Sequence, residues 1–379
     1  MTSPYQIDIV RPDELGASER ALWTDIVRDD PAYASPYFRP EFALAAGKVA
    51  PHARVAVMHR AGQIAGFLPF QRRGRLLQPI AAPLNDYHGV IARPGEGPGL
   101  DEARGLMGAS KAQVAGWVGS DAPGPRLVER TCLLAHAPDG WDAYMAERRR
   151  EHGKYFKNKD RSRRAFERDC GTPAFRFADR SPELLDRLIE LKREQYRRTR
   201  RHDVFACGWT RDLLAALLEA GEGEFGAGLS VMEWEGETVA LTYGLWAGER
   251  YHFWFPTFAP RFGRFGTGGV LTEETIRWGA GRGLRSFDFG FAGESYKKYF
   301  CNGSQSVLEG EVEEPGWRAA ASRALDALDR RPDSALARIR ASARRRFAVI
   351  DACETTPWAR LAGTAAAAAA FARRSEAAA

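Results

Sequence analysis

Four side chains that can hold or transfer a proton lie close together in the sequence near residue 290. They are Asp288, Glu294, Tyr296 and Lys297. A carboxylate can act as a general base, a phenol can act as a general acid, and an ammonium group can stabilise negative charge. We therefore take Asp288 and Glu294 as candidate bases, Tyr296 as the candidate acid and Lys297 as the candidate cation. The two carboxylates also have structural interpretations, in which Asp288 caps the following turn and Glu294 is an exposed loop charge.

These four residues follow a strand, a glycine-rich loop, a helix and a second strand. We expect the first strand at residues 251–255, the loop at 263–269, the helix at 271–281 and the second strand at 285–289. Helix N-termini with no bulky side chains over their N–H groups bind phosphate, because free donors and the helix dipole both favour negative charge. The loop therefore predicts a phosphate site. The alternative is that its glycines only allow close helix–strand packing.

Pro256 directly follows the first of these strands. Proline cannot donate a hydrogen bond to a neighbouring strand, so its place predicts a β-bulge or the end of strand pairing. If residues 251–255 and 285–289 separate at this point, an extended ligand can lie between them and pair with the free strand edge.

This stretch resembles the acyl-CoA-binding core of the GNAT acetyltransferase superfamily. It is more closely similar to CelD-like cellulose-biosynthesis proteins and, more distantly, to FemAB-like peptidyltransferases. These families carry the glycine-rich turn, the helix, a short strand with Asp-Phe-Gly (here residues 288–290) and a Tyr-Lys-x-x-Phe ending (here residues 296–300). The superfamily loop usually reads [Q/R]-x-x-G-x-[G/A]. In this sequence Gly263 takes the first place and Arg264 comes one position late.

The resemblance implies a cosubstrate, acetyl-CoA or another acyl-CoA, with its pyrophosphate on the glycine-rich loop and its pantetheine arm between the two strands. It also implies direct attack in a ternary complex, and we expect the neighbouring Cys301 to be structural. The residues expected to bind the cosubstrate are Pro256, Thr257, Arg264, Phe265, Gly266, Thr267, Gly268 and Gly269.

Five further residues are candidates for the acceptor site. Asp86, Tyr87 and His88 follow a strand of the first half and resemble an Asp-Tyr motif of CelD-like proteins. Tyr243 and His252 lie on two expected neighbouring strands and can point into the same slot. Each also has a structural interpretation, because a loop histidine is often simply hydrogen-bonded and strand aromatics often only pack.

Two hairpins share the pattern Val-Met-x-x-x-Gly, at residues 57–62 and 231–236. With the order of the elements, this predicts a duplicated α/β unit, as in the pair of GNAT-like folds that the resemblance implies. We therefore expect an α/β (α+β) protein with tandem GNAT-like mixed-sheet domains at residues 1–145 and 146–314, and a helical extension at 315–379. In the first domain we expect a helix at 101–118 and a strand at 126–135.

The extension carries the whole net charge of +6, because residues 315–379 contain 12 Arg and 6 acids while the rest of the chain is balanced. Its apolar periodicity predicts two amphipathic helices, at about 317–328 and 336–350, followed by a low-complexity tail from 362 that we expect to fray. These helices can pack on the catalytic half, on polysaccharide-synthesis machinery or on a membrane surface. A second basic segment, residues 147–168, is either a solvated helix face or an anion-binding wall.

Several functional classes find no support. The start of the chain has no secretory signal, and the five scattered cysteines argue for a reducing compartment. The histidine spacings predict no metal site, and there is no Walker loop or nucleophile elbow. We expect a cytoplasmic protein, peripheral to the inner membrane if the extension binds there, with no nucleic-acid partner.

The resulting hypothesis is an acyl-CoA-dependent N-acyltransferase whose acceptor is a small-molecule amine. By resemblance to CelD-like proteins, this acceptor is an amino sugar or another precursor of the cell envelope or exopolysaccharide. Two alternatives remain open at this point. One is a FemAB-like aminoacyl-tRNA-dependent peptidyltransferase, and the other is a non-catalytic scaffold with a degenerate acyltransferase fold.

Overall fold

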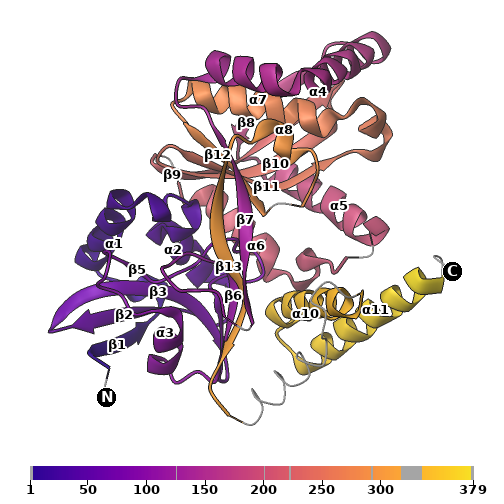
Figure 1. Cartoon of the computed structure of the whole chain (residues 1–379). Coiled ribbons are helices and arrows are strands. Elements are labelled where there is room, and N and C mark those ends of the chain that lie inside the picture. Colours follow the sequence, from indigo (N-terminus) through magenta and orange to yellow (C-terminus); the bar gives the residue numbers. More distant parts are fainter. Residues whose placement is uncertain are drawn as a thin grey trace.

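One mixed sheet of 13 strands runs through the whole molecule and joins its two halves (Figure 1). In this computed structural model, residues 3–124, 126–199, 201–221, 223–291, 293–316 and 335–376 are described. The strand order is β1-β2-β3-β4-β6-β13-β7-β12-β11-β10-β9-β8, with the short β5 paired to β3.

The N-terminal half contains three helices and seven strands within the described residues. Its strands are β1 (Tyr5–Val10), β2 (Ala53–Arg60), β3 (Gln63–Arg73), β4 (Leu76–Pro79), β5 (Ile91–Ala92), β6 (Lys111–Trp117) and β7 (Leu127–His136). Its helices are α1 (Ala17–Asp29), α2 (Pro40–Val49) and α3 (Leu100–Leu106).

The C-terminal half begins with the long helix α4 (Trp141–Asp169) and then repeats the same order of elements. Its strands are β8 (Ala174–Asp179), β9 (Phe225–Trp234), β10 (Glu237–Ala247), β11 (Arg250–Phe258), β12 (Ser286–Phe291) and β13 (Gly303–Glu313). Its other helices are α5 (Pro182–Thr199), α6 (Trp209–Glu219), α7 (Thr267–Gly281) and α8 (Lys297–Phe300).

The two halves are structural duplicates. In the first half β1, β2, β3 and β4 are successive antiparallel neighbours and β4 pairs with β6 in parallel; β8, β9, β10, β11 and β12 repeat this arrangement. Even the hairpin turns match, because Ala61-Gly62 and Glu235-Gly236 all have positive φ, as tight two-residue hairpin turns require. The predicted tandem α/β architecture is thus confirmed.

Two strands hold the halves together. β13 lies between β6 and β7, and β7 also pairs with β12, so strands of the two halves alternate at the centre of the sheet. Helix α2 packs against α6, and one hydrophobic cluster extends across this contact. The expected boundary between residues 145 and 146 falls inside α4.

One expected helix was wrong, and two strands were not predicted. Residues 101–118 do not form one helix, because Gly108 with φ +61 ends the chain's helical turn and residues 111–117 alternate in burial and pair with β13. The strands β8 and β13 were not predicted. By contrast, the apolar face expected for α5 is buried, at Leu184, Leu185, Leu188, Ile189 and Leu191.

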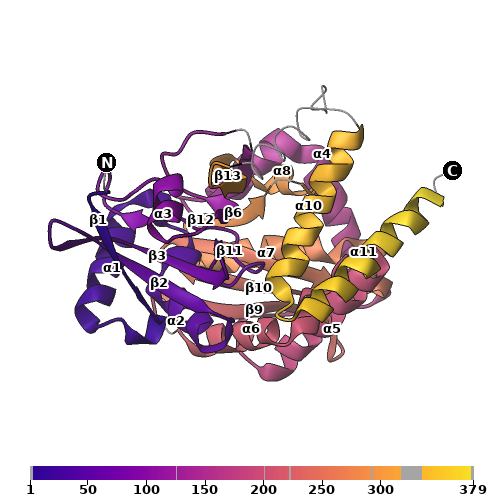
Figure 2. The ribbon, with the colours of Figure 1, turned by 90° about the horizontal axis from the view of Figure 1, so that it is seen from below.

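The C-terminal extension forms α10 (Ala335–Cys353) and α11 (Pro357–Glu376), which Figures 1 and 2 show together at one end of the molecule. Helix α10 confirms the helix expected at 336–350, whereas the one expected at 317–328 lies outside the described residues. The tail does not fray as expected, since α11 includes it up to Glu376, and its alanines have the strongest helix propensity.

Candidate active site

The strands β11 and β12 separate after a short parallel contact. Their pairing covers Arg250–Ser286, Tyr251–Phe287 and His252–Asp288 and then ends. On its other side, β11 shifts register against β10 between Leu241 and Tyr243, and Phe255 has φ +55. Such a bulge bends a strand, so β11 turns away from β12 next to Pro256. The predicted separation and bulge are confirmed, although β11 itself continues to Phe258.

A buried lysine holds this bulge. Lys192 of α5 donates a hydrogen bond from Nζ to the carbonyl of Pro256 at 3.0 Å and another to Oε1 of Gln195 at 3.1 Å. The residue is only 8% exposed, and this burial lowers the pKa of Lys192 to about 8. Because burying an ammonium group is costly without strong partners, its contact with Pro256 indicates a role in shaping the strand.

The loop after β11 ends at the N-terminus of α7. Gly266 adopts the left-handed conformation with φ +60, and the helix begins at Thr267, four residues earlier than expected. The first N–H groups of a helix have no intrahelical partner, so Thr267 and Gly268 present free donors, whereas the Gly269 amide donates to the Gly266 carbonyl at 3.0 Å. Thr267 is only 1% exposed, and its hydroxyl has no hydrogen-bond partner among the described residues.

A cation lies at this helix N-terminus. Lys159 of α4 donates a hydrogen bond from Nζ to the carbonyl of Gly266 at 3.1 Å. Burial lowers the pKa of Lys159, and the part of the chain that the structure describes offers it no ion pair. Placing a positive charge at the positive end of a helix dipole is unfavourable unless an anion lies between them. Lys159 and α7 therefore form a site for an anion.

Two arginines of the basic segment dock α4 onto α7. Arg163 pairs with Glu274 at 2.6 Å, and Arg149, which pairs with Asp160 of its own helix at 2.8 Å, lies 3.9 Å from Glu273. Lys154, Lys157, Arg161 and Arg164 are exposed. Much of residues 147–168 is thus a solvated helix face, and Lys159 is the residue of this segment that lies at the N-terminus of α7.

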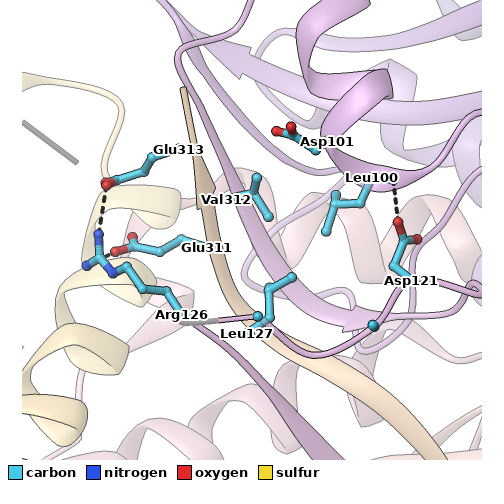
Figure 3. A pocket seen from close by; sticks show the side chains of 10 residues that line it. Leu100, Asp101, Asp121, Arg126, Leu127, Glu311, Val312 and Glu313 are labelled. Carbon is cyan, nitrogen blue, oxygen red and sulfur yellow. Dashed lines mark hydrogen bonds and ion pairs between the residues drawn. The ribbon is translucent and has the colours of Figure 1, made fainter. Parts of the chain in front are cut away.

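Helix α3 of the N-terminal half, which corresponds to α7, cannot accept an anion in the same way. The carboxylate of Asp121 already accepts the hydrogen bond of the Leu100 amide at 2.8 Å (Figure 3). A cavity of about 260 Å³ adjoins this helix, and its lining includes Asp101, Asp121, Glu311 and Glu313. The guanidinium group of Arg126 in its lining is paired with Glu311 and Glu313. Phosphate would be repelled by this set of carboxylates.

In the N-terminal half, the space between β4 and β6, which corresponds to the space between β11 and β12, is filled by the segment around His88. Strand β4 leaves β6 after Leu77 pairs with Ala112. Beyond that point the segment around His88 takes its place, since the His88 amide donates to the Gly116 carbonyl at 3.0 Å and the Val118 amide to the His88 carbonyl at 2.8 Å. Gly116 is required here, because a Cβ would collide with the carbonyl of Asp86. Beyond His252 and Asp288, by contrast, no backbone segment within the described residues pairs between β11 and β12.

The segment around His88 also places Asp86 next to β11 and β12. Oδ2 of Asp86 lies 3.1 Å from Nε2 of His252, and Nδ1 of His252 lies 3.6 Å from Oδ2 of Asp288. The side chain of Asp86 is 30% exposed, whereas those of His252 and Asp288 are 1% and 0% exposed. The three residues form a chain of charges at the position where β11 and β12 part, with Asp86 as its accessible end.

The carboxylates determine the charge of His252. Burial alone would lower the pKa of His252, but Asp288 and Asp86 outweigh it and raise the pKa to about 9. Burial would likewise raise the pKa of Asp288, yet the charge of His252 and its contacts lower it. Two carboxylates and one imidazolium give this group of three a formal net charge of −1. This arrangement can attract an ammonium group and can receive a proton at Asp86.

Aromatic side chains enclose His252. The rings of Tyr37 and Tyr87 lie 5.2 Å and 6.1 Å from its ring. Both hydroxyls, Nδ1 of His252 and Oδ2 of Asp288 have no hydrogen-bond partner within the described residues. Unsatisfied buried polar atoms are rare in folded proteins, and four of them meet here. Their grouping distinguishes this position from an ordinary packed core.

The remaining candidates after β12 have different roles. Oδ1 of Asp288 accepts a hydrogen bond from the Gly290 amide at 2.7 Å, so the turn-capping interpretation also holds. Lys297 donates to the carbonyls of Phe289 and Phe291 at 2.7 and 2.8 Å and pairs with Glu294 at 2.8 Å. Partial burial would raise the pKa of Glu294, but Lys297 lowers it. Lys297 thus fixes the end of β12 instead of meeting a ligand.

Tyr296 keeps its proton. Burial is the main cause that raises the pKa of its phenol, and the neighbouring Glu294 adds to it. A phenol that stays protonated at neutral pH can donate to a leaving group. Its position at the start of α8 places it beside the same strand end as Lys297.

Several sequence-predicted residues do not reach the site. Tyr243 is fully buried, and its hydroxyl donates to the Leu214 carbonyl at 2.8 Å. Nε2 of His88 accepts from the Ala115 amide at 3.1 Å, and burial lowers the pKa of His88 to about 3. Arg264 faces solvent and pairs with Asp169 at 3.4 Å, while Phe265 packs in the core beside Phe166. Each has a structural role that occupies its functional group.

Sequence reasoning missed Lys159 and Lys192 as site residues. Lys159 was visible only as one of many basic residues in its segment. Lys192 had a clearer signal, because it occupies the apolar stripe of α5, four residues after Leu188. A lysine at a buried helical position normally needs a specific partner.

Comparison with known proteins identifies part of the chain. Residues 153–298 match the family model described as acetyltransferase (GNAT) domain. A comparison with curated protein sequences finds no match.

Solved structures share the fold at low sequence identity. FemX has a TM-score of 0.53 at 13% identity, with 80% of this chain and 97% of FemX covered. A conserved protein of unknown function from Bacteroides thetaiotaomicron VPI-5482 has a TM-score of 0.51 at 11% identity, with 80% and 99% covered. A tandem GNAT protein from the clavulanic acid biosynthesis pathway has a TM-score of 0.46 at 11% identity, with 82% and 100% covered.

Proposed function

We propose that this protein transfers an acyl group from an acyl-CoA to the amine of a small molecule. The observation that carries the proposal is the contrast between the two slots. Beyond Asp288 no described segment pairs between β11 and β12, and Lys159 lies at the N-terminus of α7, whereas the counterpart space is filled by residues near His88 and its helix is capped by Asp121. An acyl-CoA needs both an extended slot for its arm and an anion site for its phosphates.

The pyrophosphate would lie on the first turn of α7, against the ammonium group of Lys159 and the N–H groups of Thr267 and Gly268. The pantetheine arm would follow the free edge of β11 beyond His252, because strand addition satisfies amide groups on both sides. The bulge at Pro256, held by Lys192, gives this edge its direction. The thioester would then lie next to the Asp86–His252–Asp288 charges.

The reaction forms a C–N bond and breaks a C–S bond. The acceptor amine loses a proton to Asp86, attacks the thioester carbonyl and forms a tetrahedral intermediate, which then expels the thiolate of CoA. Tyr296 is the group we assign to protonate that thiolate. His252 and Asp288 do not touch the acceptor in this scheme; they position Asp86 and balance its charge.

We further propose that the acceptor is an amino sugar or a related precursor of the cell envelope or exopolysaccharide. The negative net charge of the Asp86–His252–Asp288 group supports a cationic amine, and the resemblance to CelD-like proteins supports the sugar. We expect the reaction to take place in the cytoplasm, where acyl-CoA is made.

Titration with acetyl-CoA and longer acyl-CoAs tests the proposal. Gly268→Glu should abolish binding, because it places a carboxylate on the phosphate site, and the added Cβ meets only Phe258 at 3.8 Å. Gly281→Glu at the other end of α7 is the matched control, since a Cβ there meets open space. Acyl-CoA binding that survives Gly268→Glu would show that the site is elsewhere.

A second candidate is transfer from an aminoacyl-tRNA, as the FemAB-like resemblance implies. The shared fold with FemX supports it, and α4 and α5 offer basic residues to RNA phosphates. Under this alternative the full-length protein binds tRNA in a steeply salt-dependent way and does not bind CoA. A scaffold role without catalysis predicts a third result, in which acetyl-CoA binds but no amine is acylated.

A further inference from the structure

Helix α10 ends in a fixed position between the two halves. Arg73 of β3 donates to the carbonyls of Ala352 and Glu354 at 2.6 and 2.7 Å. From the other half, Nε1 of Trp209 donates to the carbonyl of Cys353 at 3.3 Å. Because both halves bind the same turn, the direction in which α11 leaves the molecule is determined.

The outward face of α11 is apolar. Trp358 is 81% exposed and Leu361 is 62% exposed, and the alanines at 362 and 365 continue the same face. The inward side is mixed, since Arg360 pairs with Asp351 at 3.1 Å and a Cβ at Gly363 would meet Ile350 at 2.9 Å. Trp358 and Leu361 thus form an uncovered apolar stripe on the outward side, whereas a surface helix usually turns its apolar stripe to the core.

Helix α10 combines a further exposed apolar side chain with positive charge. Phe347 is 52% exposed. The helix sequence contains five arginines, and its first acid is Asp351, whose carboxylate already pairs with Arg360. Arg345 is exposed. The extension thus carries exposed aromatic and aliphatic side chains next to a net positive charge.

We propose that α10 and α11 dock the protein on the surface of an anionic lipid bilayer. Helices that lie in the membrane interface combine Trp, Phe and Leu on one side with arginines that contact lipid phosphates. Charge complementarity favours this occupant over a second copy of the chain, because two copies would bring two positively charged extensions together. Within residues 3–316 and 335–376, leaving aside residues 125, 200, 222 and 292, no helix is both long and apolar enough to span the bilayer.

The binding follows from two weak contributions that act together. Each arginine near an anionic surface contributes attraction that salt screens, and the apolar side chains insert below the lipid headgroups. Neither contribution alone holds a protein stably on a membrane. Docking is therefore reversible, sensitive to lipid charge and weakened by salt.

Flotation of the full chain with phosphatidylglycerol-containing vesicles tests the proposal, with pure phosphatidylcholine vesicles beside them. We expect binding to the anionic vesicles only, reduced by about tenfold when Trp358→Ala and Leu361→Ala are combined. Arg345→Glu with Arg346→Glu should reduce it to a similar extent. Val128→Ala, at a residue that is 52% exposed on β7, and Arg282→Glu, directly after α7, are the matched controls.

Other results overturn the proposal. Equal binding to both vesicle types, or none to either, excludes an anionic membrane partner. Concentration-dependent dimerisation that Trp358→Ala abolishes, without vesicle binding, assigns the face to a second copy. Acyl-CoA binding is measured in parallel on each variant and should not change, so this result is independent of the proposed acyltransferase function.

Discussion

Asp86 and His252 come from different halves of the duplicated chain, and Nε2 of the histidine lies 3.1 Å from Oδ2 of the aspartate. The contact exists because residues around His88 fill the slot of their own half and so carry Asp86 across to the open slot. Under the proposed function, the N-terminal half thus contributes Asp86 to the acceptor site of the C-terminal half.

Replacement of Asp86 by Asn should remove turnover while leaving acyl-CoA affinity intact. The amide keeps the shape of the side chain but cannot receive a proton, and general base catalysis contributes roughly 100- to 10,000-fold in rate. The measurement is kcat together with calorimetric acyl-CoA binding. Asp8→Asn is the control, because Asp8 also lies 3.1 Å from a histidine, His59, but on the surface. Unchanged kcat in Asp86→Asn would falsify its role as base.

Protein stability should fall as the pH rises through about 9. The pKa of His252 is raised in the folded state to about 9, so its protonated form stabilises the fold fully below pH about 6.5 and loses this contribution as it deprotonates. The difference from its ordinary value corresponds to about 3 kcal/mol. Urea unfolding at pH 6.5, 8 and 9.5 should show this fall in the wild type and a smaller one in His252→Gln. Parallel pH curves for the two proteins would contradict the assignment.

Lys159→Gln should weaken acyl-CoA binding by about tenfold, because it removes one charge-assisted contact to phosphate. The same substitution should slightly stabilise the free protein, since it takes a positive charge away from the N-terminus of α7. Calorimetry and thermal unfolding without ligand measure the two effects. Lys157→Gln, exposed on the same helix, should change neither quantity.

Each chain should bind one acyl-CoA. The second slot is filled and its helix terminus is capped by Asp121, so titration should give a stoichiometry of one despite the duplicated fold. Asp121→Asn should leave that number unchanged, because it does not empty the slot. A second equivalent of bound acyl-CoA would show that residues near His88 move aside.

Lys192→Met should affect the KM for acyl-CoA more than the free energy of unfolding. The methionine fills a similar volume and avoids burying an ammonium group, which offsets the lost hydrogen bonds to Pro256 and Gln195. We expect the free energy of unfolding to change by less than about 1.5 kcal/mol and the KM for acyl-CoA to rise several-fold. An unfolded variant would instead assign Lys192 a mainly structural role, and Lys48→Met on the surface provides the comparison.

Local signals in the sequence were sufficient for the architecture. Pro256 indicated the bulge, the glycines after Phe262 indicated the helix N-terminus, and the hairpin repeat indicated the duplication, since each of these depends on backbone preferences of a few residues. Asp86, His252 and Asp288 were all singled out, but not as one group. Their contact depends on pairing between residues more than 160 positions apart, which no local pattern contains.

The errors have the same origin. The second part of the helix expected at 101–118 was a strand, β6, because its partner, β13, lies about 200 residues later in the chain. Arg264 and Phe265 stood next to the right glycines, but a side chain's direction within a turn is set by what packs around it, here Asp169 and Phe166. Tertiary contacts, unlike turns and helix starts, are not written into neighbouring residues.

The place of β13 also has a consequence for synthesis on the ribosome. Strands β6 and β7 do not pair with each other. Both pair with β13, residues 303–313, which is synthesised much later. Until nearly the whole catalytic region has emerged, the nascent N-terminal half therefore keeps two exposed strand edges, which are prone to association with other chains. A truncation before residue 303 should consequently yield not an independent first domain but an aggregating fragment.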